Sequence, residues 1–165
     1  MNSTPLNSSI TASEALSLFE LSSEDLDRVR AFGKLCLPEL DRFIELFYEW
    51  QDERGMTKQW FTADTLSRVQ GQQKAYWTEF FAGQEMLGTV HARIGLPLPT
   101  YFASVDLSFR IWIQRIYPGG LSPDEFSKTI CSFTKLLHLD TNVVVESYTR
   151  MTSKQILDQR KALME

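Results

Sequence analysis

The sequence has few cysteines, no long apolar run and no excess of basic residues, and each shortage excludes a class of protein. Its two cysteines, Cys36 and Cys131, fit neither a disulfide framework nor a zinc-ligand spacing, so we expect both to be small buried side chains in a reducing compartment. No run approaches the roughly 18 apolar residues of a membrane-spanning helix. Because the N-terminus also lacks the features of a signal peptide, we expect a soluble cytoplasmic protein with no membrane partner.

Charge and length narrow the class further. The chain has 17 basic and 21 acidic residues, and the basic ones are scattered, usually within a helical turn of an acid. Such a pattern builds no cationic stripe for phosphates, so no nucleic-acid partner is expected. A length of 165 residues predicts a single domain that is large enough to close around a small molecule.

The spacing of apolar residues predicts an all-α chain. After a disordered tail at residues 1–10, predicted helices begin near residues 11, 22, 38, 62, 84, 99 and 122, with a loop around Gly55. The strongest start signal is Ser122-Pro123-Asp124-Glu125, where a cap, a first-turn proline and two acids follow one another. The last helix has no stop signal, so we expect the chain to be a module of a longer protein.

His91 is the first candidate site residue. It lies at the end of a short apolar helical stretch that Gly95, Pro97 and Pro99 terminate. This arrangement is one way to present a neutral imidazole nitrogen to a metal in an apolar pocket, although a core histidine with satisfied nitrogens has the same pattern. The other histidine, His138, lies between two leucines without any motif, and we interpret it as structural or interfacial.

Two polar residues interrupt the apolar faces of predicted helices. Tyr48 follows Phe47, and Gln70 follows Val69. If His91 ligates iron from one side, a phenol and a carboxamide are suitable hydrogen-bond donors to a partly negative oxygen atom on the other side. The alternatives are an ordinary half-buried tyrosine, a surface glutamine, and aromatic residues that only fill a core.

The run His91-Ala92-Arg93-Ile94-Gly95-Leu96-Pro97, with Tyr101 after it, resembles the proximal histidine segment of the globin-coupled sensors, which are bacterial heme proteins. The pair Phe47-Tyr48 is similar to the segment that carries the distal tyrosine of that family. Tyr76-Trp77 resembles its late distal-helix aromatic, which places Gln70 at a position that the family fills with Ser, Thr, Leu or Gln. The resemblance covers about residues 22–150.

The resemblance implies a globin-like helical sandwich with an extra N-terminal helix, which forms a homodimer through a four-helix bundle of the last two helices. It implies a sensor globin domain at 11–150 and, at 151–165, the start of a signalling helix toward an output domain. It also implies heme b with His91 as the metal ligand, and Tyr48 and Gln70 as hydrogen-bonding partners of O2. The residues expected to contact the heme are Tyr48, Val69, Gln70, Leu87, Val90, Ile94, Tyr101 and Phe109.

The expected function is therefore reversible binding of O2, and also of CO and NO, as a signal to a C-terminal output domain. By resemblance that domain is a diguanylate cyclase that makes cyclic di-GMP, whereas this chain itself is not an enzyme. Two alternatives stay open. One is a heme-free interaction module of globin shape, and the other is a heme peroxidase or nitric oxide dioxygenase, for which no distal His and Arg pair and no flavin or nicotinamide motif is visible.

Overall fold

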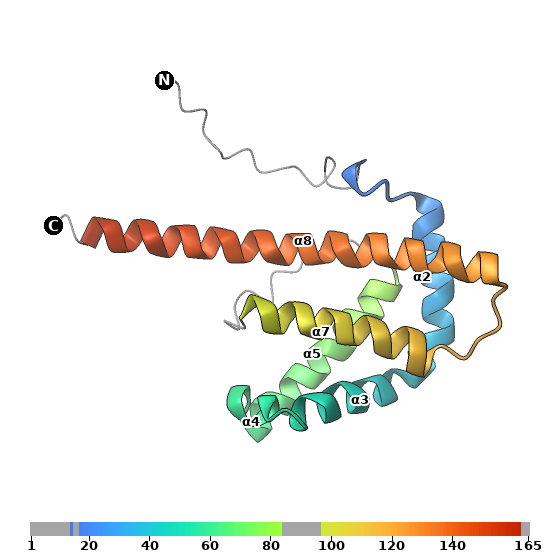
Figure 1. Cartoon of the computed structure of the whole chain (residues 1–165), viewed down its shortest axis with the longest axis horizontal. Helices are drawn as coiled ribbons and strands as arrows, with labels where there is room; N and C mark the ends of the chain where they lie inside the picture. The colour runs from blue at the N-terminus through green and yellow to red at the C-terminus, as the bar shows by residue number, and fades with distance from the viewer. Residues whose placement is uncertain (1–13, 15–16, 84–96, 163–165) are drawn as a thin grey trace.

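The computed structural model describes residues 14, 17–83 and 97–162, and all regular structure in these ranges is helical (Figure 1). The bounds of the elements, in chain order, are α2 (Ser23–Cys36), the 3-10 turn η1 (Leu37–Glu39), α3 (Leu40–Asp52), α4 (Met56–Trp60), α5 (Ala63–Phe81), α7 (Leu98–Ile111), the π-helical turn η2 (Trp112–Ile116) and α8 (Pro123–Ala162). The helix predicted near residue 11 lies mostly, and the one predicted at 84–94 wholly, outside the described residues.

Three helices begin at the N-caps that the sequence predicts. The hydroxyl of Ser22 accepts from the backbone amide of Asp25, whose carboxylate accepts from the backbone amide of Ser22, so α2 starts with a complete capping box. Thr62 caps α5 in the simpler way, through its hydroxyl alone. Ser122 and Glu125 repeat the reciprocal pattern at the start of α8, at 3.3 and 3.1 Å.

Two elements differ from the predicted pattern. The loop expected around Gly55 contains the five-residue helix α4, which follows Gly55 in the left-handed conformation at φ 67°. A helix of this length offers too few residues for a periodic signal. The helix predicted to begin near residue 99 changes to π-type hydrogen bonding over its last turn, η2, where the amide of the C-cap residue Tyr117 donates to the carbonyl of Trp112 at 2.9 Å.

Aromatic rings from several helices form one continuous core. Phe43 of α3 stacks on Trp112 of η2 at 4.3 Å between ring centroids, and Trp77 of α5 meets both rings edge-on. Phe133 of α8 contacts Phe32 of α2 from the other side at 5.8 Å. All five side chains are at most 2% exposed, so α2, α3, α5, η2 and α8 share one hydrophobic core.

Helices α2 and α5 cross at a glycine. A Cβ atom added at Gly33 would lie 2.5 Å from the Cβ atom of Phe81, which is closer than carbon atoms approach one another. The small residue therefore allows the two backbones to pack closely, and Phe81 itself is 2% exposed.

The prediction that both cysteines are buried is wrong for one of them. Cys36 is buried at the end of α2, but Cys131 is exposed on α8. The next two residues of α8, Ser132 and Phe133, are fully buried. Because successive residues of a helix are rotated by about 100°, the position before this pair faces outward. His138, on the same helix, is exposed as well.

Helix α8 is 40 residues long and runs along one side of the molecule, extending well beyond the other helices (Figure 1). It passes through residue 150, where the sequence places the end of the globin domain, without a break. Met151, Ile156 and Leu157, in its distal part, are 43%, 47% and 57% exposed. No helix in the described residues is long and apolar enough to cross a lipid bilayer.

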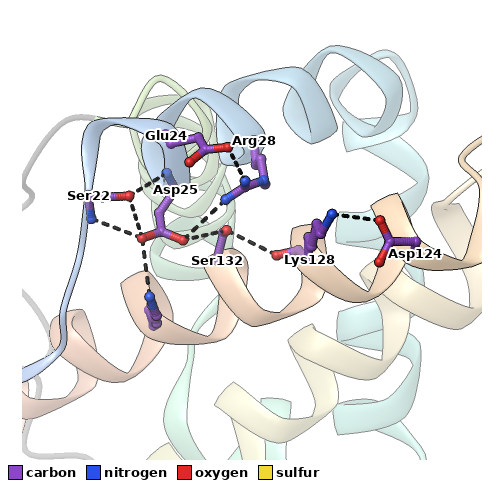
Figure 2. Close-up of polar contacts among 8 residues, drawn as sticks. Ser22, Glu24, Asp25, Arg28, Asp124, Lys128 and Ser132 are labelled. Carbon is purple, nitrogen blue, oxygen red and sulfur yellow. Dashed lines mark hydrogen bonds and ion pairs between the residues drawn. The ribbon is translucent and has the colours of Figure 1, made fainter.

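A buried carboxylate joins α2 to α8 (Figure 2). Asp25 is 5% exposed and accepts hydrogen bonds from the Ser22 hydroxyl at 2.8 Å, the Ser132 hydroxyl at 2.7 Å and the Lys135 ammonium at 3.2 Å. Burial raises the pKa of Asp25, but the hydrogen bonds from Ser22, Ser132 and Lys135 outweigh burial and hold the pKa well below its ordinary value. The carboxylate is therefore ionised at neutral pH and holds the start of α2 on α8.

Candidate functional site

Tyr48 lies on the buried face of α3. The apolar residues Phe43, Ile44 and Phe47 share this face through their helical spacing, and the ring of Tyr48 is 5.3 Å from that of Phe47. The side chain is 6% exposed, and no described residue forms a hydrogen bond with its hydroxyl. Burial raises the pKa of Tyr48 to about 12, so its hydroxyl remains a neutral donor at physiological pH. Tyr48 is thus a buried donor with the capacity to bind a ligand.

Helix α5 packs against α3 and carries Gln70, the second polar residue predicted to face the ligand (Figure 1). Helix α4 connects the two helices in the chain. Val69 and Gln70 are both half-buried. No hydrogen bond joins Gln70 to Tyr48 in the described residues. The structure therefore leaves the carboxamide of Gln70 near the core, without defining a partner for it.

Gln73 is a candidate that the sequence did not identify. Its Oε1 atom is buried and has no hydrogen-bond partner. Gln73 follows Gln70 by three residues and precedes the buried Trp77 by four, so all three share one face of α5. This spacing was visible in the sequence, but Gln70, Gln72 and Gln73 are chemically alike, and only burial distinguishes Gln73 among them.

The predicted residues of α7 lie against α8. Tyr101 is 4% exposed, and its hydroxyl shares a hydrogen bond with that of Thr141 on α8. Phe109 is half-buried, with its ring 5.7 Å from that of Phe133. Burial, and next the negative charge of Asp140, raise the pKa of Tyr101, so its phenol stays protonated. Tyr101 therefore joins α7 to α8 through the hydroxyl of Thr141.

Four of the predicted contacts lie outside the described residues. Leu87, Val90, His91 and Ile94 all belong to the segment 84–96, so the structure does not place the predicted metal ligand. The same segment separates α5, with its candidate donors, from α7.

The described residues fit an apolar planar cofactor. The core that joins α3, α5 and η2 is built mainly of aromatic rings, and only a few neutral polar atoms lie in these three elements without a hydrogen-bond partner. Besides the Gln73 carbonyl, the indole Nε1 atoms of Trp77 and Trp112 are buried without a hydrogen-bond partner. A porphyrin pocket has this character, with an apolar lining and one or two donors aimed at the metal-bound ligand.

A comparison with known protein families concerns the class of cofactor and not the individual site residues. The Protoglobin family matches residues 11–154, which include every described helix up to the distal part of α8. The fold and the match together define a heme-binding domain of the globin class. The chain belongs to the Protoglobin family. No curated protein sequence matches it.

Proposed function

We propose that this domain binds O2 reversibly at ferrous heme b and reports the presence of O2 to an output domain. The observation that carries the proposal is the side chain of Tyr48, which is 6% exposed on the packed face of α3 and whose hydroxyl no described residue engages, in a chain of the Protoglobin family. A bound heme would supply an iron atom that binds O2, CO or NO reversibly. His91 would hold that iron through its imidazole.

Tyr48 would stabilise a bound gas ligand by donating a hydrogen bond to it. A hydrogen bond to a partly negative acceptor contributes about 1.5–3 kcal/mol. Because the pKa of Tyr48 is raised to about 12, the donor keeps its proton throughout the physiological range. A sensor requires a ligand that binds two conformations with different free energy, and this hydrogen bond is the source of the difference.

The absorption spectrum of the purified chain tests the proposal directly. We expect a Soret band after reconstitution with hemin, and a shift of that band when the reduced protein takes up O2 or CO. A chain that shows no Soret band under these conditions is a heme-free interaction module, and the proposed function is then wrong.

Tyr48→Phe removes the donor and keeps the ring. We expect the O2 dissociation rate to rise by about ten- to a hundredfold, because a loss of about 1.5–3 kcal/mol corresponds to that range. The rate is measured by mixing the oxygenated protein with an O2 scavenger in a stopped-flow instrument. The CO dissociation rate is the internal control, since bound CO is a weaker acceptor and should respond much less. Equal O2 dissociation rates in Tyr48→Phe and the wild type would remove Tyr48 from this role.

The same measurement separates the two glutamines. Gln73→Ala is expected to change the O2 dissociation rate or the rate of autoxidation, because its buried carboxamide has an oxygen atom without a partner. Gln70→Ala is the matched variant on the same face of α5. An effect confined to Gln70→Ala would support the sequence-based prediction that Gln70 contacts O2. If neither variant has an effect, neither glutamine contacts the ligand.

We further propose that α7 and α8 pair with those of a second copy in a four-helix bundle. Two features support this partner, the 48% exposed Phe102 on α7 and the exposed apolar residues on the distal part of α8. Sedimentation of the chain as a dimer is expected, and a monomer at all concentrations would contradict it.

The resemblance to globin-coupled sensors makes a diguanylate cyclase the proposed output domain, in a cytoplasmic protein whose enzymatic activity lies outside this chain.

A further inference from the structure

A buried acid that gas binding does not use lies between α5, α7 and α8. Asp140 of α8 is 6% exposed. Its Oδ2 atom accepts a hydrogen bond from the hydroxyl of Tyr76, near the end of α5, at 2.8 Å. Its Oδ1 atom is buried and has no hydrogen-bond partner. The carboxylate is thus only half satisfied in a site that water does not reach.

Nothing among the described residues neutralises this carboxylate. The titratable groups that act on it are the phenols of Tyr76 from α5 and Tyr101 from α7, and neither of them is basic. The described ion pairs of the molecule do not include Asp140. Burial therefore favours the protonated acid and raises the pKa of Asp140 to about 6, although the hydrogen bond from Tyr76 opposes this shift.

The position of Tyr76 connects this acid to the ligand-binding side. Tyr76 follows Gln73 by three residues on α5 and immediately precedes Trp77, whose ring contacts Phe43 of α3 at 5.3 Å. Any movement of α5 on ligand binding would therefore change the contact between Tyr76 and Asp140. The charge on Asp140 changes the same contact from the other side, because an ionised carboxylate accepts a stronger hydrogen bond than a neutral one.

We propose that Tyr76 and Asp140 form a proton-linked latch between the ligand-binding helix α5 and the long helix α8. The latch rests on the proposed function, since it requires that the pocket binds a gas. Asp140 acts as a positioning residue through Tyr76. Its ionised form accepts the stronger hydrogen bond from Tyr76, but the buried charge without a neutralising group weakens the packing of α5 on α8 overall. By linkage, a ligand that alters the latch alters proton binding at Asp140, and protons alter the affinity for the ligand to the same extent.

The first test measures O2 dissociation from the heme-loaded chain between pH 5 and pH 7.5. We expect the wild-type rate to change by about fivefold or more across this range, which is the lower end of typical coupling between sites. Asp140→Asn and Tyr76→Phe are both expected to abolish the dependence, and Tyr76→Phe keeps the test valid if Asp140→Asn does not fold. Asp158→Asn, which changes an exposed acid on the same helix, should keep the wild-type dependence.

The second test is urea unfolding of the same proteins at both pH values, which needs no gas. The folded-state pKa of Asp140 lies above its unfolded value, so its contribution to stability falls as pH rises through about 6. Relative to the wild type, the unfolding equilibrium constant of Asp140→Asn should therefore decrease by about tenfold from pH 5 to pH 7.5.

Three outcomes overturn the latch. If the ratio of the unfolding constants of Asp140→Asn and the wild type does not change with pH, Asp140 does not ionise in this range and the latch is wrong. The expected ratio together with an unaltered pH dependence of O2 dissociation in both variants leaves Asp140 a structural acid without coupling. A chain without a Soret band overturns the proposed function itself, and that failure is recognised before either variant is measured.

Discussion

Replacing His91 by alanine is expected to abolish stoichiometric heme retention. His91 is the only histidine of this chain in the motif that resembles a proximal ligand segment, and the domain belongs to a family for which heme binding is implied. His91 would hold the heme iron, so the variant would retain the cofactor through apolar contacts with the porphyrin alone. We expect the variant to elute from gel filtration with little or no Soret absorbance per chain, whereas the wild type carries close to one heme.

His138→Ala is the matched control for this experiment. The chain has two histidines, and His138 is exposed on α8, so its removal should leave heme content and spectrum unchanged. Added imidazole is small enough to replace a missing side chain, and we expect it to restore part of the heme binding of His91→Ala. Full heme content and an unaltered ferrous spectrum in His91→Ala would refute the assignment of His91, and loss of heme from His138→Ala alone would move the ligand to α8.

Asp25→Ala is expected to lower the free energy of unfolding by about 3 kcal/mol, which combines the loss of a capping box with the loss of charge-assisted hydrogen bonds. In the variant, the ammonium of Lys135 loses its bond to Asp25 but still donates to the carbonyl of Glu20, just before α2. The side chain of Lys135 is 34% exposed, so water also solvates it. The single proton of the buried Ser132 hydroxyl can then be donated to the carbonyl of Lys128, which lies 3.0 Å away, and this limits the loss. Urea unfolding followed by circular dichroism measures the difference.

The dependence of this effect on pH has a definite sign. Because the folded-state pKa of Asp25 lies below its ordinary value, the stabilisation is fully present above about pH 4 and is lost as pH falls below it. The wild type and Asp25→Ala should therefore converge in stability on acidification. Asp27→Ala changes an exposed acid on the same helix that pairs with Arg30, and it should cost less than about 0.5 kcal/mol. An equal loss from both variants would show that helix charge, and not the buried network, stabilises α2.

The helix starts were predictable because capping chemistry is local. The residues Ser22, Thr62 and Ser122 each act on a backbone amide three positions ahead, so the signal and its target lie within one turn. The short helix α4 and the π-helical end at Trp112–Ile116 were not predictable in this way. The first is too short to be periodic, and the second is a change of hydrogen-bonding partner that leaves the side-chain pattern intact.

Some residues of the candidate site were predictable from the local sequence pattern, and others were identified only from the packed structure. Tyr48 was recognisable because it interrupts an apolar helical face, and burial of that face agrees with the pattern. Gln73 was not recognisable, because a glutamine on α5 reveals its environment only once α5 is packed. The exposed Cys131 shows the reverse case, in which residue type predicted burial and the rotation of α8 decided otherwise.

By itself, the sequence determined the helical class, the capped helix starts and the motif around His91, because each of these depends on residues within a few positions of one another. Only the tertiary structure decided that Ser132 meets Asp25 across 107 residues and that Tyr76 meets Asp140 across 64. Such contacts depend on how the helices cross. The crossing is set by the shapes of many side chains at once, such as the close approach of Gly33 to Phe81, and no local pattern encodes it.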